Sequence, residues 1–210
     1  MREVQTVLDS AVATLWARAA VNGTAFRTLI ERSPVIPAVR ASEHLGAAIA
    51  APSAVVYLLF GNVMTVPDIV RTLRAGGKTA IVNIDLLAGL DGSASAVQFL
   101  ESCHVAGIIS THTETLRASR ARGLLTVQRS FLLDSQAVGN GLRALDRFEP
   151  DAVELLPAPV APRVVATFSR AHPDVVLTAG GLVASLAEID ELVRAGVCAV
   201  SVSDPVMWIA

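Results

Sequence analysis

The sequence contains few aromatic and few charged residues. Aromatic residues make up 4% of the 210 residues and charged residues 17%, whereas hydrophobic residues reach 52%. This balance excludes disorder for most of the chain and predicts a core of Val, Leu, Ile and Ala. The longest apolar run, residues 54–60, is shorter than the roughly 20 residues of a transmembrane helix. No basic leader precedes an apolar stretch near residue 1, so we expect no signal peptide and a cytoplasmic protein.

Cysteine, lysine and histidine are also scarce. Cys103 and Cys198 have neither the spacing of a metal site nor the number for a disulfide framework, and the four histidines do not cluster. We therefore expect no metal and no cofactor. Lys78 is the only lysine and precedes an expected strand, which disfavours a Schiff-base aldolase. A net charge of -2 disfavours a generic, charge-driven binder of nucleic acid.

Short, β-branched apolar runs recur along most of the chain and alternate with segments of helical spacing. Continuous apolar runs of this kind are typical of parallel strands that are buried on both faces. The runs begin near Val35, Val55, Thr79, Val105, Leu124, Ala152, Val175 and Val197. The helical segments include residues 67–74, 135–148 and 186–193. This order predicts an α/β fold, a (β/α)8 TIM-type barrel over residues 34–210, with a doubly wound open sheet as the alternative. Pro37 predicts a bulge or an irregular first strand.

Residues 1–33 form a separate, N-terminal helical extension in this scheme. An apolar helical face includes Val4, Val7, Leu8, Ala11, Val12, Leu15 and Trp16, and the pattern resumes at Phe26 after Asn22-Gly23. We expect a helix that closes the bottom of the barrel. The alternative is an arm through which two chains form a homodimer.

Charged side chains follow several of the expected strands. Arg40, Asp85, Arg129 and Glu154 lie at strand ends, which meet at one face of a barrel. Asp85 and Glu154 are candidates for binding the hydroxyl groups of a polyol or for acid–base chemistry. Arg40 and Arg129 are candidates for pairing with these acids or with a phosphate. A structural ion-pair network is the alternative.

The last two strand ends predict a phosphate site. Gly180 and Gly181 follow one strand, and Ser203, Asp204 and Pro205 follow the next. Loops at these two positions of a barrel frequently bind phosphate, because glycine permits close approach and helix amides attract an anion. The alternative is a tight turn followed by a short helix that Asp204 caps.

A cluster of arginines is a weaker candidate for binding RNA phosphates. Arg117, Arg120 and Arg122 lie on the helix after the expected fourth strand, and Arg143 and Arg147 lie one turn apart on the next helix. An ordinary solvated helix face is the alternative that the sequence favours.

These motifs resemble the glycerol-3-phosphate-responsive antiterminators, a family of bacterial transcription regulators. The matching segments are residues 34–40, 82–89, 106–111, 128–135, 151–157, 179–182 and 199–204, followed by Trp208. Order and spacing agree throughout, and the family has the same proline as Pro37. The chain departs from the family pattern in residues 1–33 and at Asn83, where a histidine is usual.

The resemblance implies a barrel without catalytic activity that binds glycerol 3-phosphate at its mouth and acts on a leader mRNA of glycerol metabolism. Gly180, Gly181 and Ser203 would hold the phosphate. Asp85 and Glu154 would bind the glycerol hydroxyls, and Arg40 and Arg129 would frame the site, in a distribution of roles that we infer from charge. Two alternatives stay open: an enzyme acting on a small sugar phosphate with Asp85 or Glu154 as base, and a scaffold that assembles through its N-terminal helix.

Overall fold

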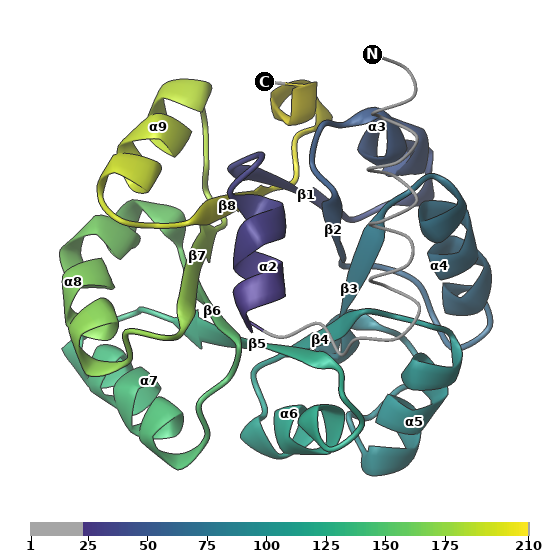
Figure 1. Cartoon of the computed structure of the whole chain (residues 1–210), viewed down its shortest axis with the longest axis horizontal. Coiled ribbons are helices and arrows are strands. Elements are labelled where there is room, and N and C mark those ends of the chain that lie inside the picture. Colours follow the sequence, from purple (N-terminus) through teal and green to yellow (C-terminus); the bar gives the residue numbers. More distant parts are fainter. Residues whose placement is uncertain (1–22, 210) are drawn as a thin grey trace.

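The structure, a computed structural model, describes residues 23–209, in which strands and helices alternate around a closed barrel (Figure 1). All neighbouring strands are parallel, and β1 also pairs with β8, so the sheet has no edge. The strands are β1 (Val35–Val39), β2 (Val55–Leu58), β3 (Thr79–Asn83), β4 (Gly107–Ser110), β5 (Leu125–Phe131), β6 (Ala152–Leu156), β7 (Val176–Gly180) and β8 (Ala199–Val202). The predicted (β/α)8 barrel is confirmed, and the open sheet is wrong because β1 and β8 close the ring.

All of the labelled helices except α2 surround this ring on its outer side (Figure 1). The helices are α2 (Gly23–Ile30), α3 (Leu45–Ala50), α4 (Val66–Ala75), α5 (Ala94–Ser102), α6 (Thr113–Arg120), α7 (Ser135–Arg147), α8 (Ala161–Ala171) and α9 (Leu186–Arg194), of which only α2 lies in the centre of the view. Short 3-10 turns are η1 (Ser42–His44), η2 (Ile84–Leu86), η3 (Ala158–Val160) and η4 (Pro205–Ile209). Within the described residues, no helix is both long and apolar enough to cross a membrane.

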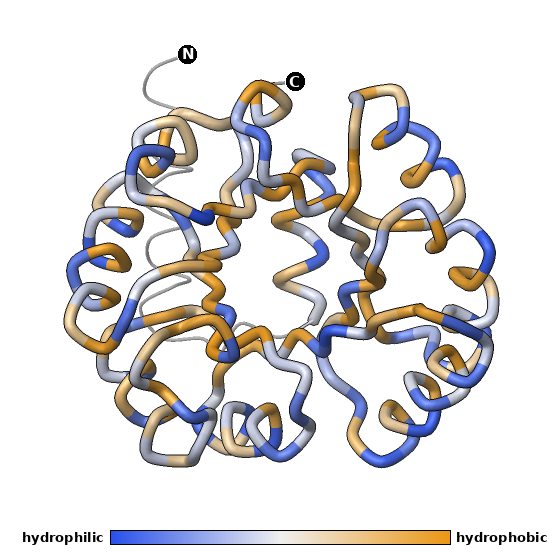
Figure 2. Tube along the Cα trace, turned by 180° about the vertical axis from the view of Figure 1, so that it is seen from behind, coloured by the Kyte–Doolittle hydropathy of each residue, from blue (hydrophilic) through white to orange (hydrophobic). Residues whose placement is uncertain are grey.

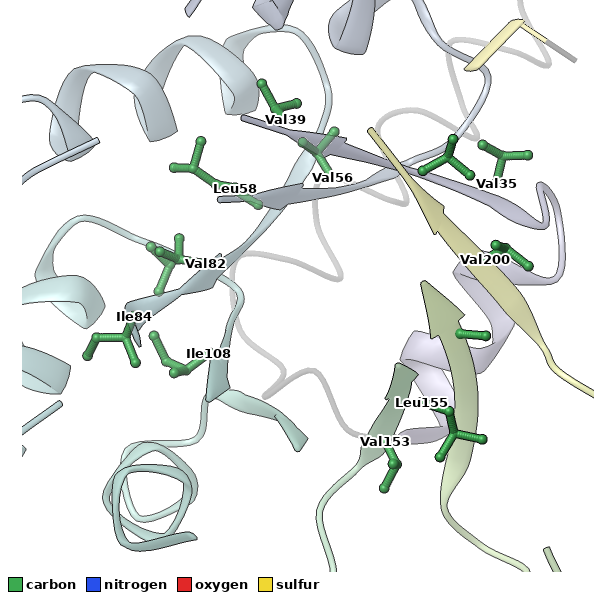
Figure 3. Packing of buried hydrophobic residues seen from close by; sticks show 14 of the residues in the cluster. Val35, Val39, Val56, Leu58, Val82, Ile84, Ile108, Val153, Leu155 and Val200 are labelled. Carbon is green, nitrogen blue, oxygen red and sulfur yellow. The ribbon is translucent and has the colours of Figure 1, made fainter. Parts of the chain in front are cut away.

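The core consists of two apolar layers. In the outer layer, one face of each strand packs against the helices, as Figure 3 shows for Val39, Val56 and Leu58. The strands form a largely apolar ring, whereas the helices alternate between polar and apolar residues (Figure 2). The inner layer lies inside the barrel, where Tyr57 and Ile81 belong to one buried cluster. Both faces of each strand are thus buried, which accounts for the continuous apolar runs.

Helix α2 closes the N-terminal end of the barrel. Phe26 and Ile30 are fully buried and pack with the inner cluster. The Gly23 amide donates to Oδ1 of Asp151 at 3.2 Å, and Asp151 lies immediately before β6. The structure thus places a helix where the N-terminal amphipathic pattern predicts one. The apolar face expected from Val4 to Trp16 lies outside the described residues, and the dimerisation arm stays a prediction.

Pro37 lies within a continuous strand. It pairs in register with Val202 of β8, and pairing with β2 begins only at Ala38. The proline therefore interrupts no ladder on the β2 side, where its missing N–H would otherwise leave a gap. The irregular first strand that we expected is not observed, since β1 runs unbroken over all five residues.

Candidate functional site

A polar layer lies inside the barrel at the C-terminal ends of the strands, an end that we call the mouth. Side chains alternate along a strand, so a residue two positions after an inner apolar residue also faces inward. The inner cluster contains Ile81, Val127, Ala152, Val176 and Ala199. The residues two positions later are Asn83, Arg129, Glu154, Thr178 and Ser201. The bottom of the barrel interior is therefore apolar and its mouth is polar.

Glu154 is the centre of this layer. Its side chain is 2% exposed, and Oε2 accepts a hydrogen bond from Nε of Arg129 at 2.8 Å. Oε1 accepts from the Ser201 hydroxyl at 2.6 Å. Arg129 also lies over the exposed ring of Phe131, with 5.8 Å from guanidinium carbon to ring centroid. The carboxylate is thus buried with a charged partner and a neutral donor, as a buried charge requires.

Gly180 is necessary for this arrangement. A Cβ at position 180 would lie 2.1 Å from Oγ of Ser201 and 3.0 Å from Oε1 of Glu154. The absence of a side chain therefore makes room for the Ser201–Glu154 hydrogen bond. The structure brings Gly180 to the site, where it makes room for protein groups, and its contact with a phosphate stays a prediction.

Asp85 holds the end of β4 in place. Its carboxylate accepts hydrogen bonds from Oγ of Ser110 at 2.7 Å, from the Thr111 amide at 2.6 Å and from Oγ1 of Thr111 at 2.9 Å. The Asp85 amide in turn donates to Oδ1 of Asn83 at 3.1 Å, which caps η2. Asp85 is exposed at the mouth, and three of its acceptor positions are already occupied by β4 and the residue that follows it.

The predicted phosphate corner contains three exposed groups at neighbouring strand ends. Arg40 follows β1, Ser203 follows β8 and Gly181 follows β7, and all three are exposed. Gly181 has a φ of +73°, a left-handed conformation that favours glycine. Among the described residues, Arg40 has no ion pair. Oδ1 of Asp204 accepts from the Val206 amide at 3.0 Å, so the acid caps η4, and that amide is not free for an anion.

Sequence reasoning missed two inward-facing residues, Ser201 of this layer and Tyr57 of the inner cluster below it. Ser201 lies in the middle of an apolar run, and Tyr57 lies between Val56 and Leu58. Burial and the nearby Glu154 carboxylate raise the pKa of Tyr57 well above its ordinary value. The alternation of side chains along each strand, counted from the inner cluster, would have found both.

Large apolar side chains border the mouth. In the described part of the chain, the most exposed of these follow the C-terminal ends of strands. They are Met64, Leu133, Leu182, Val206 and Ile209. The mouth therefore combines a polar interior with an apolar rim.

Three of the five arginines suggested for RNA are bound to other parts of the protein. Arg120 contacts Asp151 at 3.2 Å and donates to the Glu149 carbonyl at 2.7 Å. Arg122 donates to Glu101 at 2.6 Å, and Arg117 donates to the Arg147 carbonyl. Arg117 and Arg120 also lie 5.3 and 4.8 Å from the ring centroid of Phe148. Arg117 and Arg120 thus hold α6 against the segment between α7 and β6, whereas Arg122, which follows α6, contacts α5.

The remaining two arginines are more available. Arg143 and Arg147 are exposed on α7, and the Arg143 guanidinium bonds its helical neighbour Asn140. Lys78 lies at the opposite end of the barrel, where Nζ donates to the carbonyls of Ala51 at 2.5 Å and Ser53 at 2.7 Å. Among the described residues, no three His, Cys, Asp or Glu side chains are grouped to hold a metal ion.

These features define a TIM-type barrel with a polar, charge-paired mouth of the kind that binds small molecules. Residues 35–208 match the model of the glycerol-3-phosphate responsive antiterminator family, to which this chain belongs.

Similar proteins agree with this assignment. The uncharacterized protein YgcP of Escherichia coli K12 is 34% identical over 183 residues, which cover 86% of this chain and 94% of YgcP. A glycerol uptake operon antiterminator-related protein from Thermotoga maritima is 29% identical with a TM-score of 0.75, over 83% of this chain and 96% of that one. The glycerol uptake operon antiterminator regulatory protein of Listeria monocytogenes is 26% identical with a TM-score of 0.79, over 84% and 95% of the two chains.

Proposed function

We propose that this chain binds glycerol 3-phosphate at the barrel mouth and, in its liganded form, prevents transcription termination in a leader mRNA of glycerol metabolism. A regulator of nascent transcripts acts in the cytoplasm. The observation that carries the proposal is the buried Glu154 carboxylate, held by Arg129 and Ser201 at the inner end of the mouth. A carboxylate with unused lone pairs accepts hydrogen bonds from ligand hydroxyls, and it disfavours an anion at the same depth.

The phosphate then belongs at the outer corner of the mouth. Arg40 supplies a positive charge, Ser203 a hydroxyl, and Gly181 a backbone that an anion can approach closely. All three are exposed at the ends of neighbouring strands. Because Asp204 caps η4, the proposed cradle relies on these groups and not on the amides at the start of that turn.

A regulator without catalytic activity is consistent with the contacts of Asp85 and Glu154, the two candidate catalytic bases. Protein groups already bind both carboxylates. Asp85 accepts three hydrogen bonds from Ser110 and Thr111, and Glu154 is paired with Arg129. Lys78, the only lysine, is bonded to two carbonyls at the far end of the barrel. We propose that the protein needs no metal and no cofactor, and that its effector is the phosphorylated polyol.

Isothermal titration calorimetry tests the ligand. We expect saturable binding of sn-glycerol 3-phosphate, and much weaker binding of glycerol or inorganic phosphate, because each fragment contacts only one end of the site. Arg40→Ala should weaken binding of the phosphorylated ligand about tenfold or more by removing a charge-assisted contact. Equal affinity for glycerol and glycerol 3-phosphate would contradict the proposed phosphate corner.

A transcription assay tests the regulatory step. On a template with a terminator in the leader of a glycerol operon, glycerol 3-phosphate should increase read-through only when this protein is present. A ligand shifts such an equilibrium only through different affinities for the two forms. Read-through that does not depend on the ligand would contradict the proposal.

A further inference from the structure

Two buried donors in the barrel have no protein partner. Among the described residues, three buried side-chain polar atoms lack a hydrogen-bond partner: Oη of Tyr57, Nδ2 of Asn83 and Nε2 of His172. Tyr57 and Asn83 are fully buried and lie inside the barrel, whereas His172 lies between α8 and β7. Buried polar groups in proteins are nearly always paired, so an unpaired donor beside a candidate ligand site needs an explanation.

The two donors lie on neighbouring strands, on the same inner side. Tyr57 of β2 pairs in register with Ile81 of β3, and Asn83 is two residues closer to the mouth. Thr178 lies beside the Tyr57 hydroxyl, but its own hydroxyl donates to the Val153 carbonyl, and no hydrogen bond of acceptable geometry joins the two side chains. Tyr57 therefore lies between Asn83 on one side and the polar groups of β6 and β7 on the other.

The orientation of the Asn83 amide is fixed by its other end. Its Oδ1 accepts from the Asp85 amide at 3.1 Å, so the two hydrogens of Nδ2 point away from η2. Burial, and after it the charge of the neighbouring Glu154 carboxylate, raises the pKa of Tyr57 and keeps the phenol protonated. The inner end of the mouth thus offers two neutral donors beside one carboxylate that accepts.

Donors next to an acceptor complement a hydroxyl group, which both accepts and donates. A ligand carboxylate or phosphate at this depth would lack a counter-charge, because the positive charge of Arg129 is already paired with Glu154. Because α2 closes the opposite end of the barrel, a ligand reaches these groups only from the mouth, with its inner end first.

We propose that Asn83 and Tyr57 bind a neutral hydroxyl group of the ligand, which therefore enters with its hydroxyl end first and keeps its phosphate at the outer loops. This inference rests on the proposed function and adds to it two residues that bind a ligand hydroxyl. The site accepts a phosphorylated polyol and excludes a phosphorylated hydroxy acid, whose carboxylate would lie beside Glu154.

Tyr57→Phe is the sharpest test because it removes a single oxygen. Calorimetry would compare sn-glycerol 3-phosphate with its two deoxy analogues, one lacking the terminal hydroxyl and the other the central one. The variant should bind glycerol 3-phosphate about tenfold more weakly than the unchanged protein. It should bind one deoxy analogue with unchanged affinity, because that analogue lacks the hydroxyl that Tyr57 contacts. The unchanged protein should bind 3-phosphoglycerate about a hundredfold more weakly than glycerol 3-phosphate, or weaker still.

A variant of the second donor and a control far from the mouth complete the test. Asn83→Asp keeps the oxygen that caps η2 but replaces the donor by an acceptor, and should also weaken glycerol 3-phosphate about tenfold. Ser33→Ala removes a buried hydroxyl at the other end of the barrel, where Oγ lies 3.5 Å from the Val35 carbonyl, and should leave ligand affinity unchanged.

The outcomes are distinguishable. If the unchanged protein binds glycerol 3-phosphate and both Tyr57→Phe and Asn83→Asp bind it equally well, the inference is wrong and the proposed function stands. An equal loss for glycerol 3-phosphate and for both deoxy analogues would show a structural role and overturn the inference as well. If the unchanged protein binds no glycerol 3-phosphate, the proposed function fails and the inference fails with it.

Discussion

Arg129 and Glu154 face each other in register on neighbouring strands, with Nε of the arginine 2.8 Å from Oε2 of the glutamate. The pair lies at the inner end of the mouth, and the two side chains are only 13% and 2% exposed. Such a pair fixes the position of a charge more than it adds stability, because desolvation opposes the attraction. Removing one partner has a larger effect than the pair's own net contribution, since the remaining charge stays buried.

Replacing Arg129 by Ala should therefore destabilise the protein by about 3 kcal/mol, as expected for a buried carboxylate left with one neutral donor. Urea unfolding followed by circular dichroism measures the change. The double variant Arg129→Ala/Glu154→Gln serves as the control, because it removes the uncompensated charge. It should be more stable than Arg129→Ala alone, and a double variant that is less stable would contradict the pairing.

Gly180→Ala should destabilise the fold by about 1–3 kcal/mol, the usual effect of overpacking. The new methyl group would lie 2.1 Å from Oγ of Ser201. Combining it with Ser201→Ala removes that oxygen, so the two substitutions should be less harmful together than the sum of their separate effects. Urea unfolding of the four proteins measures this coupling. Strict additivity would show that the two positions do not interact.

The barrel could be predicted from the sequence because each buried strand forms its own apolar run. The runs that begin near Val55 and Ala152 coincide with β2 and β6, and the helical segment expected over residues 67–74 lies within α4. Gly180 also lies at the predicted mouth. Its contact with Ser201, however, arises only when β7 and β8 pair, and Ser201 bonds Glu154 across 47 residues of sequence.

The arginines at the end of α6 and just after it show a second limit of sequence reasoning. Spacing alone placed Arg120 and Arg122 on an exposed helix face, but it gave no indication that Asp151 and Glu101 lie within reach. The Arg120–Asp151 contact depends on α6 packing beside β5, whose neighbour is β6. Long polar side chains find partners that depend on tertiary packing, and helical periodicity contains no information on it.

RNA binding should depend on α7 more than on α6. The double reversal Arg143→Glu/Arg147→Glu changes two exposed side chains, so the thermal unfolding midpoint should stay close to that of the unchanged protein. If these side chains neutralise RNA phosphates, the slope of log affinity against log salt should become shallower by about 0.7 for each phosphate of a single strand that the variant no longer neutralises. Filter binding of a leader RNA over a salt series measures this slope.

Arg120→Glu is the matched comparison for this experiment. It breaks the contact with Asp151 and should lower the unfolding midpoint, so any decrease in RNA affinity there would accompany a decrease in stability. An unchanged salt slope in the α7 variant would place the RNA-binding surface elsewhere on the protein.

The alkaline stability of the protein should depend on Tyr57, its only tyrosine. Burial and the Glu154 carboxylate raise the pKa of Tyr57 above its ordinary value of 10.0. Above pH 10 the unfolded chain therefore loses a proton that the folded protein retains. Because the folded state binds more protons, the free energy of unfolding should fall as the pH rises, by up to about 1.4 kcal/mol per pH unit from this residue.

Two measurements check this dependence. The tyrosinate absorbance of the folded protein should not appear near pH 10, the ordinary value for the group, and should rise only when the chain unfolds. In Tyr57→Phe, the free energy of unfolding should fall less steeply with rising alkaline pH. Lys78 and Cys103, whose pKa values are also shifted, titrate equally in both proteins. Their contribution cancels in the difference, which belongs to Tyr57 alone. A tyrosinate signal in the folded protein at the pH where free tyrosine ionises would contradict the raised pKa of the buried phenol.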